Sequence, residues 1–205
     1  MAPEETRHPR RLPLLLAAVG LAIAAALVGY QAYRAYVVEP RLAEEAFRIT
    51  RLTKPVVAPD FRIELPNGAT FSLAQARGKV VFLNFWATWC PPCRDEMPSM
   101  VQLARELSSR YPGRFVMVAV SVDEGWKPIF DFFQGPPPPG IVVGLDREQL
   151  ATRAYYCAAR GGCPTDYKFP ETYVVDREGR LVEYVVGPRD WSEPGVRHMV
   201  ARLAD

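Results

Sequence analysis

Residues 79–93 read K-V-V-F-L-N-F-W-A-T-W-C-P-P-C. The run 79–86 is almost continuously apolar, which is typical of a strand that is buried on both faces of a sheet. The spacing of apolar residues in 92–110 then predicts an amphipathic helix. Cys90 and Cys93 therefore stand where a buried strand meets the start of a helix, and this junction decides the fold.

Strand-like and helix-like segments alternate on both sides of this junction. Pro66-Asn67-Gly68 and residues 176–179 are typical of tight turns between paired strands. Together the segments predict an α/β or α+β sheet that helices cover on both faces, with the strand order left open. Strands are predicted at 61–65, 69–73, 114–122, 141–145, 172–176 and 181–186, and further helices at 126–133, 147–156 and 192–203.

The N-terminal region has the pattern of a membrane-spanning segment. A polar, basic stretch at 1–11 precedes an uncharged, apolar one at 12–30. As a helix the apolar stretch would span about 28 Å, close to the hydrocarbon thickness of a bilayer. Tyr30, Tyr33 and Tyr36 then follow at the three-residue spacing of an interfacial aromatic belt.

Positive charge before the apolar stretch predicts that the N-terminus stays inside and that the folded part is exported. A cleaved signal peptide, with small residues at 24–26 as its site, and a buried core helix are the alternatives. We expect four parts in the chain: a cytoplasmic N-terminus (1–11), a transmembrane signal-anchor (12–36), a stalk without chemistry (37–58) and an exported domain (59–205).

The composition excludes several classes of protein. Lys and Arg number 25 against 23 Asp and Glu, and this near balance predicts no nucleic-acid partner. A hydrophobic content of 49% and a charged content of 23% exclude a disordered or fibrous chain. Four cysteines are too few for a disulfide scaffold, so their spacing carries the information.

The Cys-Pro-Pro-Cys motif has the chemistry of thiol–disulfide exchange. A helix N-terminus favours a thiolate at Cys90, and the two-residue spacing lets Cys93 bond to it and resolve a mixed disulfide. Neither Pro91 nor Pro92 can donate an N–H to the Cys90 sulfur, which leaves the Cys93 amide as the main backbone donor. A less stabilised thiolate predicts a reductant rather than an oxidant.

Two other interpretations of this motif are a structural disulfide and a zinc site. Zinc needs two more ligands, and Cys157 and Cys163 are available in number but do not have paired Cys-x-x-Cys spacing. Both alternatives fit the strand–helix frame less well than redox exchange does.

The sequence resembles the membrane-anchored TlpA- and ResA-like branch of the thioredoxin superfamily over roughly residues 58–205. The resemblance implies a thioredoxin-like fold, which is a central mixed sheet flanked by helices with an N-terminal β-hairpin extension. It also implies that Cys90 is an exposed nucleophile and Cys93 the resolving thiol. The motifs that carry it are F-W-A-T-W-C-P-P-C-R-D-E-M-P (85–98), A-V-S-V-D (119–123), P-E-T-Y-V-V-D (170–176) and G-P-R-D-W (187–191).

The resemblance extends to the groups around the dithiol. Pro170 matches the cis proline that faces the cysteines in this family, with an ordinary strand-entry proline as the alternative. Trp86 and Trp89 resemble an aromatic collar around the sulfurs, although Trp86 can equally be a core residue. Phe169 is expected to join them in binding the substrate.

Glu96 is the candidate proton acceptor. Thioredoxins proper carry a buried acid six residues before the first cysteine, but Asn84, which cannot titrate, holds that position here. Glu96 lies three residues after Cys93, so the two share a helix face, and Glu96 matches the glutamate that ResA-like proteins hold near the dithiol. A raised pKa would let it take the proton from Cys93. The alternative is a solvated helix glutamate.

Cys157 and Cys163 enclose five residues directly ahead of the proline strand, where the family has a shorter connection. In an exported domain they are expected to form a structural disulfide. The alternatives are a second redox pair that exchanges with Cys90, and a metal role.

The expected function is that of a protein-disulfide reductase in the inner membrane, with one membrane span and its domain in the periplasm or outside the cell. The resemblance implies disulfide-containing protein substrates, such as apocytochrome c or copper-site proteins, and a membrane thiol as electron donor. We expect no cofactor, no metal and no nucleic acid. The alternative is a Sco-like copper carrier, in which a histidine later in the chain is a copper ligand; here that histidine would have to be His198. A peroxidase is a further alternative, but its motif does not fit Asn84 and Thr88.

Overall fold

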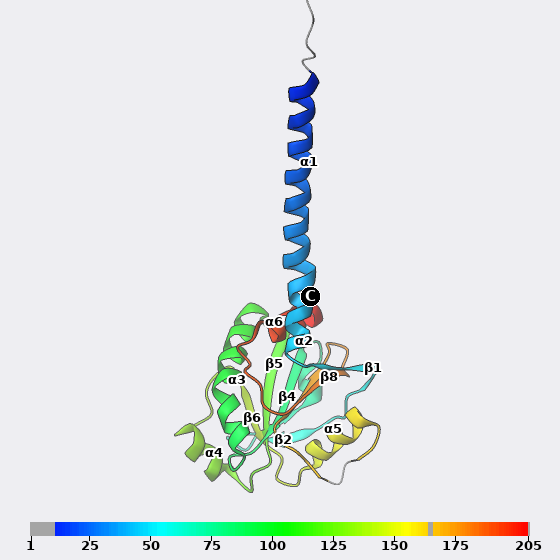
Figure 1. The fold of residues 1–205 in the computed structure, drawn as a ribbon. Helices are drawn as coiled ribbons and strands as arrows, with labels where there is room; N and C mark the ends of the chain where they lie inside the picture. The colour runs from blue at the N-terminus through cyan, green and yellow to red at the C-terminus, as the bar shows by residue number, and fades with distance from the viewer. Residues whose placement is uncertain (1–10, 164–165, 205) are drawn as a thin grey trace, which may run out of the picture. The chain divides into compact units, whose positions relative to one another are not determined.

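The computed structural model describes residues 11–163 and 166–204 (Figure 1). The expected cytoplasmic N-terminus, 1–11, lies outside the described residues except for Arg11. The chain divides into two compact units, Met1–Leu42 and Ala43–Asp205.

The described part of the first unit is helical throughout. Helix α1 (Arg11–Tyr33) continues through a π-helical turn, η1 (Arg34–Val38), into α2 (Glu39–Ala46). The run Pro13–Ala46 is long and apolar enough to cross a membrane, and it is the one such helix in the described part of the chain. None of its most apolar stretch is buried, which argues against the core-helix alternative.

The second unit is built on a mixed sheet. The strands are β1 (Thr50–Val57), β2 (Arg62–Glu64), β3 (Thr70–Ser72), β4 (Val80–Trp86), β5 (Phe115–Ser121), β6 (Val142–Leu145), β7 (Glu171–Val175) and β8 (Arg180–Val186). Strands β4, β5 and β6 run parallel, and the remaining neighbours pair antiparallel. The order across the sheet is β1-β8-β7-β4-β5-β6-β2-β3.

Helices cover both faces of this sheet, as the sequence predicted (Figure 1). Side chains on opposite faces of β4 belong to different cores. Phe82 and Trp86 join the core under α3 (Pro91–Arg110) and α6 (Pro194–Ala204), whereas Leu83 and Phe85 join the core under α5 (Leu150–Arg160). A strand buried on both faces explains the continuous apolar run in the sequence. The helical segments are the 3₁₀ turn η2 (Leu73–Ala76), α3 (Pro91–Arg110), α4 (Trp126–Phe133), α5 (Leu150–Arg160) and α6 (Pro194–Ala204).

The central mixed sheet flanked by helices, and every predicted strand and helix of the folded unit, are confirmed to within a few residues. The expected N-terminal hairpin is β2 and β3, joined through Gly68 in the left-handed region with φ 77°. The largest shift in a boundary is at α5, which begins three residues later than predicted and continues four residues further, to Arg160.

The stalk prediction for 37–58 is wrong in its second half. Phe47 is buried in the core at 1% exposure, and residues 50–57 form β1, which pairs with β8 at the edge of the sheet. Pro55 lies inside this strand, beside an irregularity in the pairing, and an edge strand tolerates a residue without an N–H. Because most residues of β1 are exposed, the strand carries no alternating apolar pattern by which the sequence would reveal it.

Close packing at the start of α6 gives a stability prediction. A Cβ at Gly195 would clash with the carbonyl oxygen of Ala43, a backbone atom that cannot turn away. Gly195→Ala is therefore expected to lower the free energy of unfolding by about 2 kcal/mol in urea denaturation. Gly162→Ala is the control, because a Cβ there would meet nothing within 4 Å. Equal stability of the two variants would contradict the prediction.

Candidate active site at the Cys90–Cys93 disulfide

The cysteine motif sits at the turn from β4 into α3. Cys90 is the N-cap residue of α3 in extended conformation, and its sulfur accepts a hydrogen bond from the Cys93 N–H at 3.4 Å. Pro91 occupies the first helical position, where a missing N–H removes no intrahelical bond. The two cysteines form a disulfide with their Cα atoms 5.3 Å apart, so the motif can close on itself.

The cysteines differ in their access to solvent. Cys93 is fully buried and Cys90 is 6% exposed. The expectation of an openly exposed Cys90 is therefore wrong for the disulfide form, in which its sulfur is bonded to a buried sulfur. Of the two cysteines, Cys90 keeps a small exposed fraction and Cys93 keeps none.

One tryptophan flanks the disulfide at the surface, and the other does not. Trp89 is 64% exposed, and its ring lies 6.0 Å from that of Phe169. The Phe169–Pro170 peptide bond is cis, so this contact brings the segment entering β7 to the cysteine motif. Trp86 is 0% exposed and packs on Phe132, 5.4 Å between ring centroids. Its expected role in the aromatic collar is wrong, because its side chain points into the core.

Glu96 is buried in α3 at 4% exposure, which excludes the solvated alternative. Its Oε2 accepts hydrogen bonds from the backbone N–H of Arg189 at 3.0 Å and from Trp191 Nε1 at 3.2 Å. Its Oε1 accepts one from Asn84 Nδ2 at 3.0 Å. Burial raises the pKa of Glu96 to about 7, against these hydrogen bonds and the positive charge of Arg189, which lower it.

Asn84 links Glu96 to the strand that follows the cis proline. Its Nδ2 also donates to Thr172 Oγ1 at 2.9 Å, while its buried Oδ1 has no hydrogen-bond partner among the described residues. Rotation of the amide would turn Oδ1 toward Glu96, where it could accept a hydrogen bond from a protonated Oε1. The sequence identified Asn84 only as a group that cannot titrate, and its contact with Glu96 was missed.

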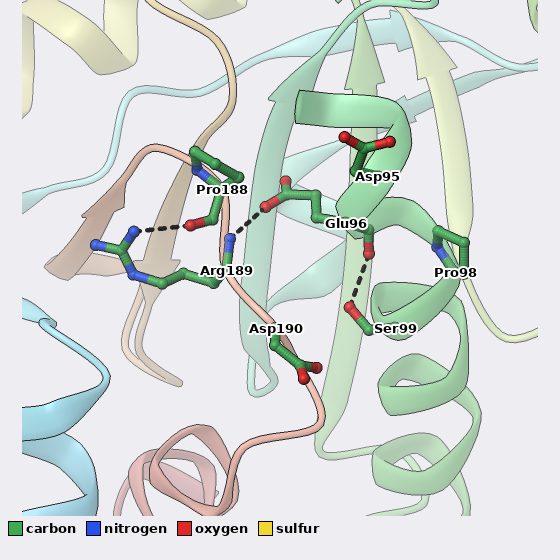
Figure 2. Close-up of a pocket in the computed structure, with 7 residues that line it drawn as sticks. All are labelled: Asp95, Glu96, Pro98, Ser99, Pro188, Arg189 and Asp190. Carbon is green, nitrogen blue, oxygen red and sulfur yellow. Dashed lines mark hydrogen bonds between the residues drawn. The ribbon is translucent and has the colours of Figure 1, made fainter. Parts of the chain in front are cut away.

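A hollow of about 510 Å³ opens beside Glu96. In Figure 2 the Glu96 carboxylate is directed at the backbone N–H of Arg189, whose guanidinium turns back to the carbonyl of Pro188. Asp95 and Asp190 also line this hollow. The G-P-R-D-W segment thus supplies two of the three donors to Glu96, a role that its sequence did not reveal.

The second pair of cysteines also forms a disulfide. Cys157 lies in the last turn of α5 and Cys163 just beyond its end, with their Cα atoms 4.1 Å apart. Both pairs are thus in disulfides, and no three His, Cys, Asp or Glu side chains of the described residues gather closely enough to hold a metal ion.

Comparison with known proteins agrees with this geometry. The Redoxin family model matches residues 54–200. The thioredoxin-like protein YneN of Bacillus subtilis (strain 168) is 31% identical over 142 residues, which cover 63% of this chain and 69% of the relative. The thiol-disulfide oxidoreductase ResA of Bacillus thuringiensis (strain Al Hakam) is 30% identical over 177 residues, which cover 85% of this chain and 88% of the relative.

A solved structure supports the same assignment. The thiol:disulfide interchange protein of the thioredoxin family from Chlorobium tepidum TLS superposes with a TM-score of 0.57 at 31% identity, covering 75% of this chain and 99% of that one. The fold, the disulfide at the helix start and these relatives agree. The chain belongs to the Redoxin family and is a thiol–disulfide oxidoreductase of the ResA type.

Proposed function

We propose that this protein reduces disulfides in exported partner proteins by dithiol exchange at Cys90 and Cys93. The observation that carries the proposal is the disulfide at the start of α3 between Cys90, which keeps a small exposed fraction, and the fully buried Cys93. The Cys90 sulfur receives one local backbone hydrogen bond, from Cys93, since Pro91 and Pro92 have no N–H. Weak stabilisation of its thiolate favours the reducing direction.

The exchange runs in two steps. The Cys90 thiolate attacks one sulfur of the partner disulfide, forms a mixed disulfide and releases the other partner sulfur as a thiolate. The Cys93 thiol then loses its proton and attacks the Cys90 sulfur, which releases the second partner thiol. The partner gains two electrons, and the protein ends in the Cys90–Cys93 disulfide form, from which a membrane thiol donor would restore the dithiol.

Glu96 is the proposed acceptor of the Cys93 proton. The two residues are three apart on the buried face of α3, a spacing at which helix side chains are neighbours. A carboxylate with a pKa near 7 is matched to a proton transfer at neutral pH. The proton would pass to solvent through the hollow beside Glu96.

The partner is proposed to bind over Trp89, Phe169 and Pro170. Trp89 offers an exposed aromatic surface beside the Cys90 sulfur, and its contact with Phe169 places the cis-proline segment next to it. The resemblance to ResA-like proteins favours apocytochrome c or copper-site cysteines as substrates, hence a role in cytochrome c maturation or metal-site assembly. Helix α1 would tether the protein to the inner membrane, with the catalytic unit in the periplasm or outside the cell.

A trapping experiment tests this function. In Cys93→Ser the mixed disulfide on Cys90 cannot be resolved, so a covalent complex with the partner is expected to accumulate. Non-reducing electrophoresis followed by mass spectrometry of the adduct would identify the partner and the bonded cysteine. Cys90→Ser, which keeps Cys93, is the matched control and should trap nothing. Equal trapping through Cys93 would contradict the assigned order of attack.

A further inference from the structure

The second disulfide encloses an arginine at the end of α5. Arg160 is the last residue of the helix, and the Cys157–Cys163 disulfide ties the helical turn before it to the chain after it. Helix ends fray readily, because their last carbonyl groups lack intrahelical partners. Tying both sides of Arg160 restricts this fraying and holds the position of its side chain.

The side chain of Arg160 forms an ion pair with the buried side chain of Glu171. Its Nη2 lies 2.5 Å from Glu171 Oε1, and Glu171 is 1% exposed. The guanidinium also lies 4.7 Å from the ring centroid of Tyr156, and the Tyr173 hydroxyl donates to Glu171 Oε2 at 2.6 Å. Among the described residues Arg160 is the cation paired with Glu171, and a buried carboxylate depends strongly on such a partner.

This ion pair adjoins the proposed partner site. Glu171 directly follows cis-Pro170 and begins β7, where it pairs with Phe85 of β4. On the other side of the proline, the Tyr156 hydroxyl donates to the Lys168 carbonyl at 2.5 Å. Helix α5 therefore contacts the chain both before and after Pro170.

We propose that Arg160, held by the Cys157–Cys163 disulfide, is a positioning residue that fixes the cis-proline segment for partner binding. The second disulfide thus supports the exchange at Cys90 and Cys93 by holding Arg160 in place, and it transfers no electrons itself. The inference rests on the proposed function, since it concerns the site at which the partner would bind.

The test measures partner binding and chemistry separately. The oxidised full chain in detergent micelles is mixed with a short peptide carrying two thiols, and reduction of the Cys90–Cys93 disulfide is followed by tryptophan fluorescence. Arg160→Gln is expected to raise the half-saturating peptide concentration about 10-fold, with less than a 2-fold change in the maximal rate. The paired change Cys157→Ser with Cys163→Ser should do the same.

Combining the variants decides whether they act together. If the disulfide acts through Arg160, the triple variant should show no further loss beyond either change alone. Arg160→Lys, which keeps the charge, should restore most of the binding. Arg153→Gln, an exposed position on the same helix, is the matched control and should resemble the unmodified protein.

Several outcomes would overturn the inference. These are unchanged binding without the second disulfide, additive losses in the triple variant, or an effect confined to the maximal rate. If Arg160→Gln does not fold, the double variant Arg160→Gln with Glu171→Gln leaves no unpaired buried charge, and it should show the same 10-fold shift. Failure of the unmodified protein to react through Cys90 would instead contradict the proposed function.

Discussion

Glu96→Gln is expected to slow the resolving step, in which Cys93 attacks Cys90, about 100-fold at pH 7. In the unmodified protein the rate should rise with pH and level off above pH 7, because the pKa of Glu96 is raised to about 7 and its carboxylate is then ionised. An amide accepts no proton, so in the variant the Cys93 thiol must ionise unaided. Its rate should keep rising through about pH 8.5, the ordinary pKa of a thiol.

The substitution is conservative in shape. The introduced glutamine amide could keep its oxygen toward Arg189 and Trp191 and turn its NH₂ toward Asn84, whose unpartnered Oδ1 can accept after rotation of the amide. The rate is measured by stopped-flow release of thiol from a preformed mixed disulfide on Cys90. Glu148→Gln, the same change at an exposed glutamate just before α5 and away from the hollow, is the control. Superimposable pH profiles for Glu96→Gln and the unmodified protein would remove Glu96 from the mechanism.

The same carboxyl group is expected to make stability depend on pH. Burial raises the pKa of Glu96 from 4.5 to about 7, so between these values the folded state binds more protons than the unfolded state. The stabilisation is complete below pH 4.5 and is lost as the pH rises through 7. The difference of about 2.5 units corresponds to a loss of about 3 kcal/mol between pH 4 and pH 8.

Urea unfolding of the oxidised protein at a series of pH values measures this loss. Other charged groups face Glu96, namely Arg189 and Asp190 from the segment before α6 and Asp95 from α3. They are present in the Glu96→Gln variant too, so the difference between the two stability curves isolates Glu96. We expect the variant to gain about 3 kcal/mol relative to the unmodified protein over this range. Parallel curves would show that Glu96 titrates normally.

The sequence predicted most of the catalytic frame because that frame is local. Three features follow one another directly in the chain: the apolar run of β4, the two cysteines and the amphipathic pattern of α3. The spacing of residues within each is enough to predict its structure. The positions of Glu96 and Pro170 came from the resemblance to the family. The cis bond, the burial of Glu96 and the thioredoxin-like fold are as that resemblance implied.

The errors concern properties that spacing does not report. The position of Trp86 along β4 fixes the face of the sheet on which its side chain lies. Whether that side chain is exposed or buried depends on α4, whose Phe132 and Phe133 cover it. Strand β1 is polar and exposed, so its place in the sheet comes from backbone pairing with β8 rather than from an apolar pattern.

By itself the sequence determined that a strand–helix junction carries a cysteine pair with the chemistry of disulfide exchange. Only the tertiary structure decided which other groups surround that pair. It brought Asn84 of β4 and the segment with Arg189 and Trp191 into contact with Glu96, and it paired Arg160 with Glu171. The reason is physical. Apolar residues recur along a strand or helix with the period of that element, so the local sequence reveals it, whereas the pKa of a carboxyl group depends on burial and on hydrogen-bond donors that distant segments supply.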